Sequence, residues 1–563
     1  MEGLPDTLDR LATRVETLER RIYALEHPAV ARSEIAALEA SPSTVTGEAL
    51  SVSVASGAFS VLGKAMLGIA GAYLLRAVAE SSSLPQTAVA AVAIAYALAW
   101  LVWASRVKAS DWLAGTTYAC TSALILAPML WELTLRFKVL PAAVSAGVVC
   151  GFVIAASALE WRRDFAPVLW VANVTGIAIA LTLAIASHEM APFIAVLLAM
   201  VLICELGTGR SRENGVRVLV ALAADVAIWA LIYIYSSPAS TRGDYPAMGM
   251  AALLAPGLGL FLIIGASLIY RTVLRGKTIT AFETIEGTIA FLLAACSLIY
   301  FGPPASAAAL GIFCVVLSGA GYAAAFARFD RNLQRRNYLI FATWSGALLL
   351  AGSLLCLPPL WQALWLGVAA TAATIAGARL GRMALELHGM VFLLAAAGIS
   401  GLLHEVFSAL AGTMPGAPGW GVCAVSMCAV LCYAAIEPCH EESWRRQDLC
   451  LVFASLAIGA VAGLVVEGLV GLTALKLVPG AHHLAFIRTF TVCVAAIALA
   501  FSGSHWRRME LTRIGYATLG LLAVKLVLED LRHGHLAFIA GSIFLFAITL
   551  IAVPRAARMG QKV

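Results

Sequence analysis

The chain consists almost entirely of apolar runs about twenty residues long, separated by short connections that hold most of the charges. The stretch from Trp506 to Arg558 shows the unit: two basic anchors enclose two apolar arms, and a polar turn at residues 530–534 separates the arms. A helix needs roughly 20 largely apolar residues to cross the hydrocarbon core of a bilayer. This unit therefore predicts a transmembrane helical hairpin with both ends on the same side.

Composition agrees with a membrane location. Of the 563 residues, 61% are hydrophobic and only 12% are charged, whereas soluble domains hold about 25% charged residues. The net charge of +6 comes from Lys and Arg beside the apolar runs, where anionic headgroups attract them, so it predicts a lipid bilayer as partner and no nucleic acid. Nearly all of the twelve Cys lie inside apolar runs, where a free Cys acts as a small hydrophobe.

The pattern predicts an all-α polytopic integral membrane protein with about eighteen transmembrane helices in nine hairpins. A helical bundle is expected over residues 59–554, followed by a basic cytoplasmic tail at 555–563. The expected spans are 59–78, 85–104, 112–131, 139–160, 165–187, 191–207, 216–235, 247–270, 279–301, 305–327, 337–357, 360–378, 386–411, 419–437, 449–470, 484–502, 511–529 and 535–553.

Basic residues alternate between the connections. Lys and Arg gather after even-numbered spans and are scarce after odd-numbered ones. Because cytoplasmic loops carry the Lys and Arg excess, both termini are expected in the cytoplasm. The sequence shows no inverted pair of interrupted spans of the kind that marks the binding site of many secondary transporters.

The first 28 residues have a different pattern. Apolar side chains recur at alternating spacings of three and four, which is the seam of a coiled coil, and branched a positions with Leu at d favour a parallel dimer. Residues 1–28 therefore predict a helix for homodimerisation or for recruiting a partner protein, and a single amphipathic helix on the membrane surface is the alternative. Residues 29–58 are expected to form a short helix and a flexible tether. The seam residues are Leu8, Leu11, Val15, Leu18, Ile22 and Leu25.

Both ends of the bundle resemble a known family. The segment from Gly63 to Arg76, placed behind a short heptad helix, and the segment from Arg513 to Asp530 are similar to the two ends of an uncharacterised family of predicted bacterial membrane proteins, catalogued as domain of unknown function number twenty-three thirty-nine. The resemblance implies a multi-pass protein of the bacterial inner membrane with a cytoplasmic coiled coil. It implies no activity, cofactor or catalytic residue.

Ionisable residues inside apolar runs are candidate functional groups, because each costs about 2.5–3.5 kcal/mol to insert at mid-membrane. Asp225 lies near the centre of its run, and Glu283 and Glu286 enter another on one helical face. Together with Lys64 as a countercharge, these residues predict a buried polar site for a proton or cation. The alternative is that Asp225 is a neutral packing group and that Glu283 pairs with a nearby cation, Arg275 or Lys277.

Histidines and a glutamate form a second candidate group at the outward turns. Histidine is the common metal ligand and pH-sensitive group, so these residues predict an external metal, proton or polar-substrate site, with ordinary interfacial histidines as the alternative. Their spacing is not a metal signature, and we predict no metal ion and no cofactor. The group comprises His404, His482, His483, His533, His535 and Glu467.

Three functions fit these patterns, in the following order. The first is a non-enzymatic envelope scaffold that uses its cytoplasmic helix for oligomerisation or recruitment. The second is a transporter or lipid-handling channel that uses the buried carboxylates. The third is a membrane enzyme that acts on a lipid-linked substrate at the outer face. A soluble-type enzyme is excluded, because no phosphate-binding loop, nucleophile elbow or zinc-protease helix is present.

The predicted topology can be tested with reporter fusions. Fusions after Arg336 and after Lys562 are expected to report the cytoplasm, and fusions after Pro303 and after Gly534 the opposite side, because only the first two lie in basic connections. The measurement is the activity of a compartment-specific reporter at each site. A cytoplasmic signal after Pro303 or Gly534 would contradict the arrangement of eighteen spans.

Overall fold

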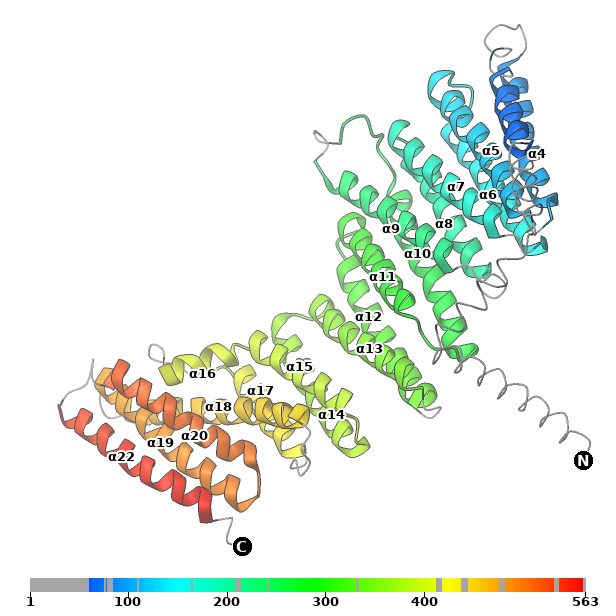
Figure 1. Ribbon diagram of the computed structural model, residues 1–563. Coiled ribbons are helices and arrows are strands. Elements are labelled where there is room, and N and C mark those ends of the chain that lie inside the picture. The colour runs from blue at the N-terminus through cyan, green and yellow to red at the C-terminus, as the bar shows by residue number, and fades with distance from the viewer. Residues whose placement is uncertain are drawn as a thin grey trace, which may run out of the picture. The chain divides into compact units, whose positions relative to one another are not determined.

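The computed structural model describes most of the chain from Ser60 onward, and this part is α-helical without a strand (Figure 1). The described residues are 60–74, 77, 85–108, 111–163, 166–207, 214–238, 240, 242–330, 334–411, 418–436, 444–474, 481–530 and 536–559. The expected coiled coil and tether at residues 1–58 lie outside these ranges. So does the end of the basic tail.

The chain forms two compact units, Met1–Ala223 and Ala224–Val563, and the boundary falls within helix α9. The first unit contains an initial helix, Ser60–Leu74, followed by α4 (Gln86–Arg106), α5 (Trp112–Trp131), α6 (Ala142–Arg163), α7 (Ala166–Ala186), α8 (Met190–Gly207) and the first half of α9 (Asn214–Ser236). The second unit contains the rest of α9, α10 (Met250–Ile269), α11 (Ala281–Phe301), α12 (Ser306–Ala324), α13 (Arg335–Cys356), α14 (Pro359–Leu380), α15 (Met383–Ile399), α16 (Leu402–Ala411), α17 (Trp420–Ala435), α18 (Trp444–Ala474), α19 (Ala481–His505), α20 (Met509–Lys525) and α22 (Leu536–Met559).

These helices follow the order of the expected spans. Within the described residues, fifteen helices are long and apolar enough to cross a membrane, and a bent pair, Met383–Ile399 with Leu402–Leu410, raises this to sixteen if it counts as one span. The helices Ser60–Leu74 and Trp420–Ala435 are apolar but shorter. The all-α membrane-protein class is thus confirmed, whereas the nine hairpins and the side on which each terminus lies stay predictions.

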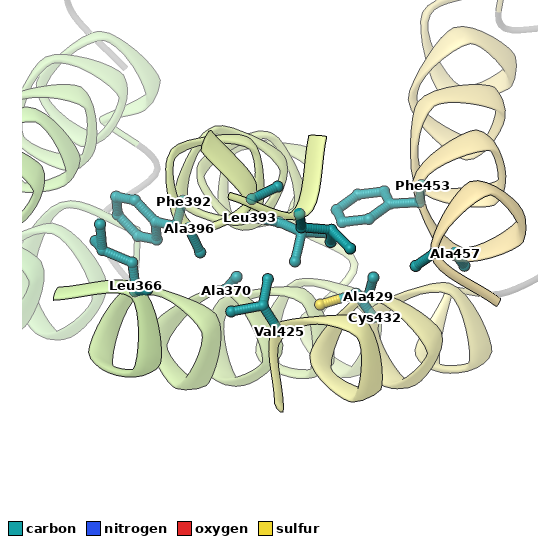
Figure 2. Close-up of a cluster of buried hydrophobic side chains, with 14 of the residues drawn as sticks. Leu366, Ala370, Phe392, Leu393, Ala396, Val425, Ala429, Cys432, Phe453 and Ala457 are labelled. Carbon is teal, nitrogen blue, oxygen red and sulfur yellow. The ribbon is translucent and has the colours of Figure 1, made fainter. Parts of the chain in front are cut away.

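Neighbouring helices pack mainly as antiparallel pairs. In the first unit, α4 lies against α5, and α6, α7 and α8 contact one another. In the second unit the extensive contacts join α10 to α11, α12 to α13, α14 to α15, and α19 to both α20 and α22. Helices α14, α15, α17 and α18 share a buried cluster that includes Phe392, Leu393, Val425 and Phe453 (Figure 2).

Glycines lie where paired helices approach most closely. A Cβ added to Gly311 of α12 would lie 2.8 Å from the carbonyl oxygen of Gly352 in α13, and one on Gly257 of α10 would lie 3.2 Å from the backbone of α11. A Cβ on Gly389 would lie 3.0 Å from the carbonyl oxygen of Ala370 in α14. Helices in lipid associate through close packing at small residues, so these glycines decide which helices pair.

Two pairs of glycines spaced four residues apart differ in their surroundings. Gly459 and Gly463 of α18 face α16, where a Cβ on either would lie 3.5 Å from Val406. A Cβ on Gly147 or Gly151 would meet nothing within 4 Å. The first motif is therefore a helix contact within the described chain, and the second faces open space.

Replacing Gly311 by Val is expected to destabilise the α12–α13 pair, because the new side chain collides with backbone that cannot move aside. Overpacking of this kind costs about 1–3 kcal/mol. Gly319→Val is the matched control, since Gly319 lies in the same helix and its Cβ position is open. The measurement is the midpoint of thermal unfolding of the purified protein in detergent. Equal midpoints for the two variants would contradict the close approach.

Candidate functional site

Asp225 and Glu286 lie together inside the second unit. Asp225 comes from the middle of α9, and Glu286 comes from the second turn of α11. A side-chain hydrogen bond joins their carboxyl groups. Both residues are buried, with 7% and 3% of their surface exposed. Two of the residues that the sequence predicts at one buried site are thus in contact.

A hydrogen bond between two carboxyl groups needs a proton on one of them, because an ionised carboxylate has only acceptor oxygens. Oδ1 of Asp225 is buried, and no amide, hydroxyl or cationic group in the described part of the chain donates to it. Two ionised carboxylates in contact would repel each other strongly in a low-dielectric interior. The arrangement is therefore suited to hold a proton, or a cation between the two groups.

Glu283 has a structural role one turn earlier in α11. Its carboxylate accepts the N–H of Thr280 at 2.9 Å, and the Thr280 hydroxyl accepts the N–H of Glu283 at 3.3 Å. This capping box satisfies two backbone donors at the start of the helix. Glu283 also forms an ion pair with Arg271, which lies one helical turn before the Arg275 considered from the sequence.

The remaining predicted residues that the structure describes lie on different helices. Lys64 belongs to the first unit, where its side chain is exposed. His404 is also exposed, and the ring of His483 packs against Phe538 with 5.0 Å between centroids. In the described part of the chain, no three His, Cys, Asp or Glu side chains are grouped to hold a metal ion. The side chains of three predicted histidines lie outside the description: His482, His533 and His535.

Glu467 forms a second carboxyl pair. It lies on α18 with 8% of its surface exposed, and a side-chain hydrogen bond joins it to Glu405 of α16. As with the first pair, one of the two groups must carry the proton of that bond. Within the described residues, Glu467 thus meets the carboxyl group of Glu405.

Arg488 is the largest side chain that is almost fully buried, with 2% of its surface exposed. From α19 it donates to the carbonyl oxygens of Ser408 and Ala409 at the end of α16, at 2.6 Å each. It also forms an ion pair with Glu529 at 2.7 Å. A cation at a helix C-terminus is favourable because the last carbonyl groups carry partial negative charge, so Arg488 caps α16 while its own charge is neutralised.

The neighbouring charges are brought together by a π-helical turn. The turn Leu526–Asp530 ends α20, and its wider winding places residue i+5 near residue i. Lys525 therefore reaches Asp530 at 2.9 Å as well as Glu529 at 3.5 Å. Its ammonium group also donates to the hydroxyl of Thr489 and to a carbonyl oxygen of α19.

Arg488 is absent from the candidates predicted from the sequence, although a signal for it exists. It lies inside the expected span 484–502, and an arginine within a span is a candidate by position alone. Its partners, in contrast, have no sequence signal, because they lie about 40 and 80 residues away along the chain.

Comparison of the chain with protein-family models, with curated proteins and with solved structures finds no match. The resemblance of the two ends of the bundle to an uncharacterised bacterial family therefore stays a prediction.

Replacing Arg488 by Met is expected to destabilise the protein strongly. Removing one partner of a buried ion pair leaves an uncompensated charge, at a cost of about 3–5 kcal/mol. The measurement is thermal unfolding in detergent, with Arg336→Met as control because Arg336 is exposed. Adding Glu529→Gln to Arg488→Met is expected to recover part of the loss, since Lys525 is then left with Asp530 as its one carboxylate partner and the cluster is neutral again. A double variant less stable than the single one would contradict the pairing.

Proposed function

We propose that this protein is a transport protein that carries protons across a membrane, with Asp225 and Glu286 as the groups that take up and release the proton. The described chain is an all-α membrane protein with many apolar helices. The observation that carries the proposal is the buried hydrogen bond between two carboxyl groups on α9 and α11. Of the three functions considered from the sequence, transport is the one that this contact supports, because a carboxyl pair can bind and release a proton.

The pair has two charge states that a membrane interior tolerates. With one proton it carries a single negative charge and keeps its internal hydrogen bond, and with two protons it is neutral. The state without a proton is costly, because it places two negative charges in contact where water is scarce. Alternation between one and two protons, with access to water first on one side and then on the other, moves one proton per cycle.

The other two functions stay predictions. The scaffold function depends on the coiled-coil seam, which lies outside the described residues. The enzyme function depends on the outer histidines, and the side chains of His482, His533 and His535 lie outside the description. The location that we propose is the inner membrane of a bacterium, which the resemblance of the two ends implies.

Asp225→Asn is expected to reduce proton flux roughly tenfold, because Asn keeps the shape and hydrogen-bonding capacity of Asp but cannot gain or lose a proton. The measurement is the internal pH of liposomes that contain the purified protein, after a membrane potential is imposed. Asp244→Asn is the matched control, because Asp244 is exposed in the connection between α9 and α10.

Infrared spectra of the same samples give a second readout. The signal of protonated carboxyl groups should change with pH in the wild type and in Asp244→Asn, and the change should be smaller in Asp225→Asn by the contribution of the Asp225–Glu286 pair. Wild-type protein without flux above that of empty liposomes, or Asp225→Asn with wild-type flux, would contradict the proposal.

A further inference from the structure

Helix α16 is a short helix that follows a sharp bend. It has ten residues, and its axis turns by 69° from that of α15 across the break at Ser400 and Gly401. Gly401 has a φ of 81°, a left-handed conformation that glycine adopts without steric cost. The Ser400 hydroxyl accepts the N–H of Leu402 at 3.3 Å and so begins the new helix. The break gives α16 a hinge at its N-terminal end.

Helix α16 lies against α18 along a stripe of small residues. A Cβ on Gly459 or Gly463 would lie in ordinary van der Waals contact with Val406, at 3.5 Å, and Ala409 lies 3.9 Å from the Cβ position of Gly463. Glu467 follows Gly463 by four residues, so it continues the same face of α18. The stripe therefore directs the Glu467 carboxyl toward α16, where it meets Glu405.

Two polar attachments hold α16, and they differ in chemistry. At its C-terminal end, Arg488 donates to two carbonyl oxygens, and a guanidinium has only donor groups. One turn earlier, the Glu405–Glu467 hydrogen bond depends on a proton. Oε2 of Glu467 is buried, and no amide, hydroxyl or cationic group of the described residues donates a hydrogen bond to it.

We propose that Glu405 and Glu467 form a second proton-binding site, and that loss of its proton releases α16 from α18. Without that proton the two carboxylates repel each other across the contact between α16 and α18, and the hinge at Gly401 allows α16 to move. The site is separate from the Asp225–Glu286 pair, so the proposal does not depend on the transport function.

The helices packed against α16 bring few other titratable groups to this pair within the described residues. Helix α16 packs against α15, α17 and α18, and against α19 through Arg488. Helix α19 also carries His483, whose ring packs against Phe538. On α16 the other titratable residue is His404, which is exposed, and at its end Arg488 is paired with Glu529. The charged residues of α15 and the other charged residues of α18 lie at the opposite ends of those helices, and α17 has none. A calcium ion would need six to eight oxygen ligands, whereas two facing carboxyl groups suit a proton.

The test is hydrogen exchange of the α16 amides, measured by mass spectrometry on the full chain in lipid nanodiscs at low and high pH, with correction for the intrinsic exchange rate. In the wild type, protection of residues 402–411 is expected to fall about tenfold or more at high pH, because local opening sets the exchange of these amides. Glu467→Gln is expected to keep α16 protected at both pH values, since its amide donates to Glu405 without a titrating proton. Glu405→Gln should behave in the same way.

The controls separate this site from the first pair. His404→Gln and Asp225→Asn are expected to show the wild-type fall in protection. A wild type without the fall, or a Glu467→Gln variant that retains it, would overturn the proposal. If sodium restores protection at high pH where a large organic cation does not, the ligand is an alkali cation, and the assignment to a proton is wrong.

Discussion

The cost of removing an ionisable side chain from water decides where the buried charges of this protein lie. The described helices meet this cost in three ways. Glu205 and Arg217 form a two-point ion pair, with nitrogen–oxygen distances of 2.6 and 3.0 Å. Arg488 satisfies its guanidinium with a carboxylate and two helix-end carbonyl oxygens. The carboxyl pairs instead require a proton, because each partner carries the same sign of charge.

Close helix packing determines which of these groups meet. Apolar side chains in lipid gain little by contacting each other, so association depends on small residues that let backbones approach. The stripe of α18 is an example, because Gly459 and Gly463 lie in the contact between α16 and α18. Glu467 continues the same face of α18, and its carboxyl group forms a hydrogen bond with Glu405 of α16. The contact of the two carboxyl groups thus depends on how apolar and small residues pack the two helices.

The sequence predicts the helical class and the burial of Asp225, because hydrocarbon thickness imposes a length on every span and a cost on every charge within it. It does not predict partners, since these depend on how each helix is rotated and on which helices are neighbours. Glu286 lies 61 residues after Asp225, and the intervening sequence has no pattern that predicts their contact. The bend before α16 is also hidden, because residues 386–411 read as one apolar run in which Gly401 is an ordinary small residue.

The charge balance of each cluster separates structural groups from groups that can change state. The network around Arg488 and Lys525 contains two cations and two carboxylates, Glu529 and Asp530, so it is neutral when every member has its ordinary charge. Gain or loss of a proton there would break an ion pair, which favours a fixed structural role. Each carboxyl pair, in contrast, already depends on a proton, and a second proton removes its remaining charge. The carboxyl pairs are therefore suited to change their charge state, and the neutral network of Arg488, Lys525, Glu529 and Asp530 is suited to hold α16, α19 and α20 in place.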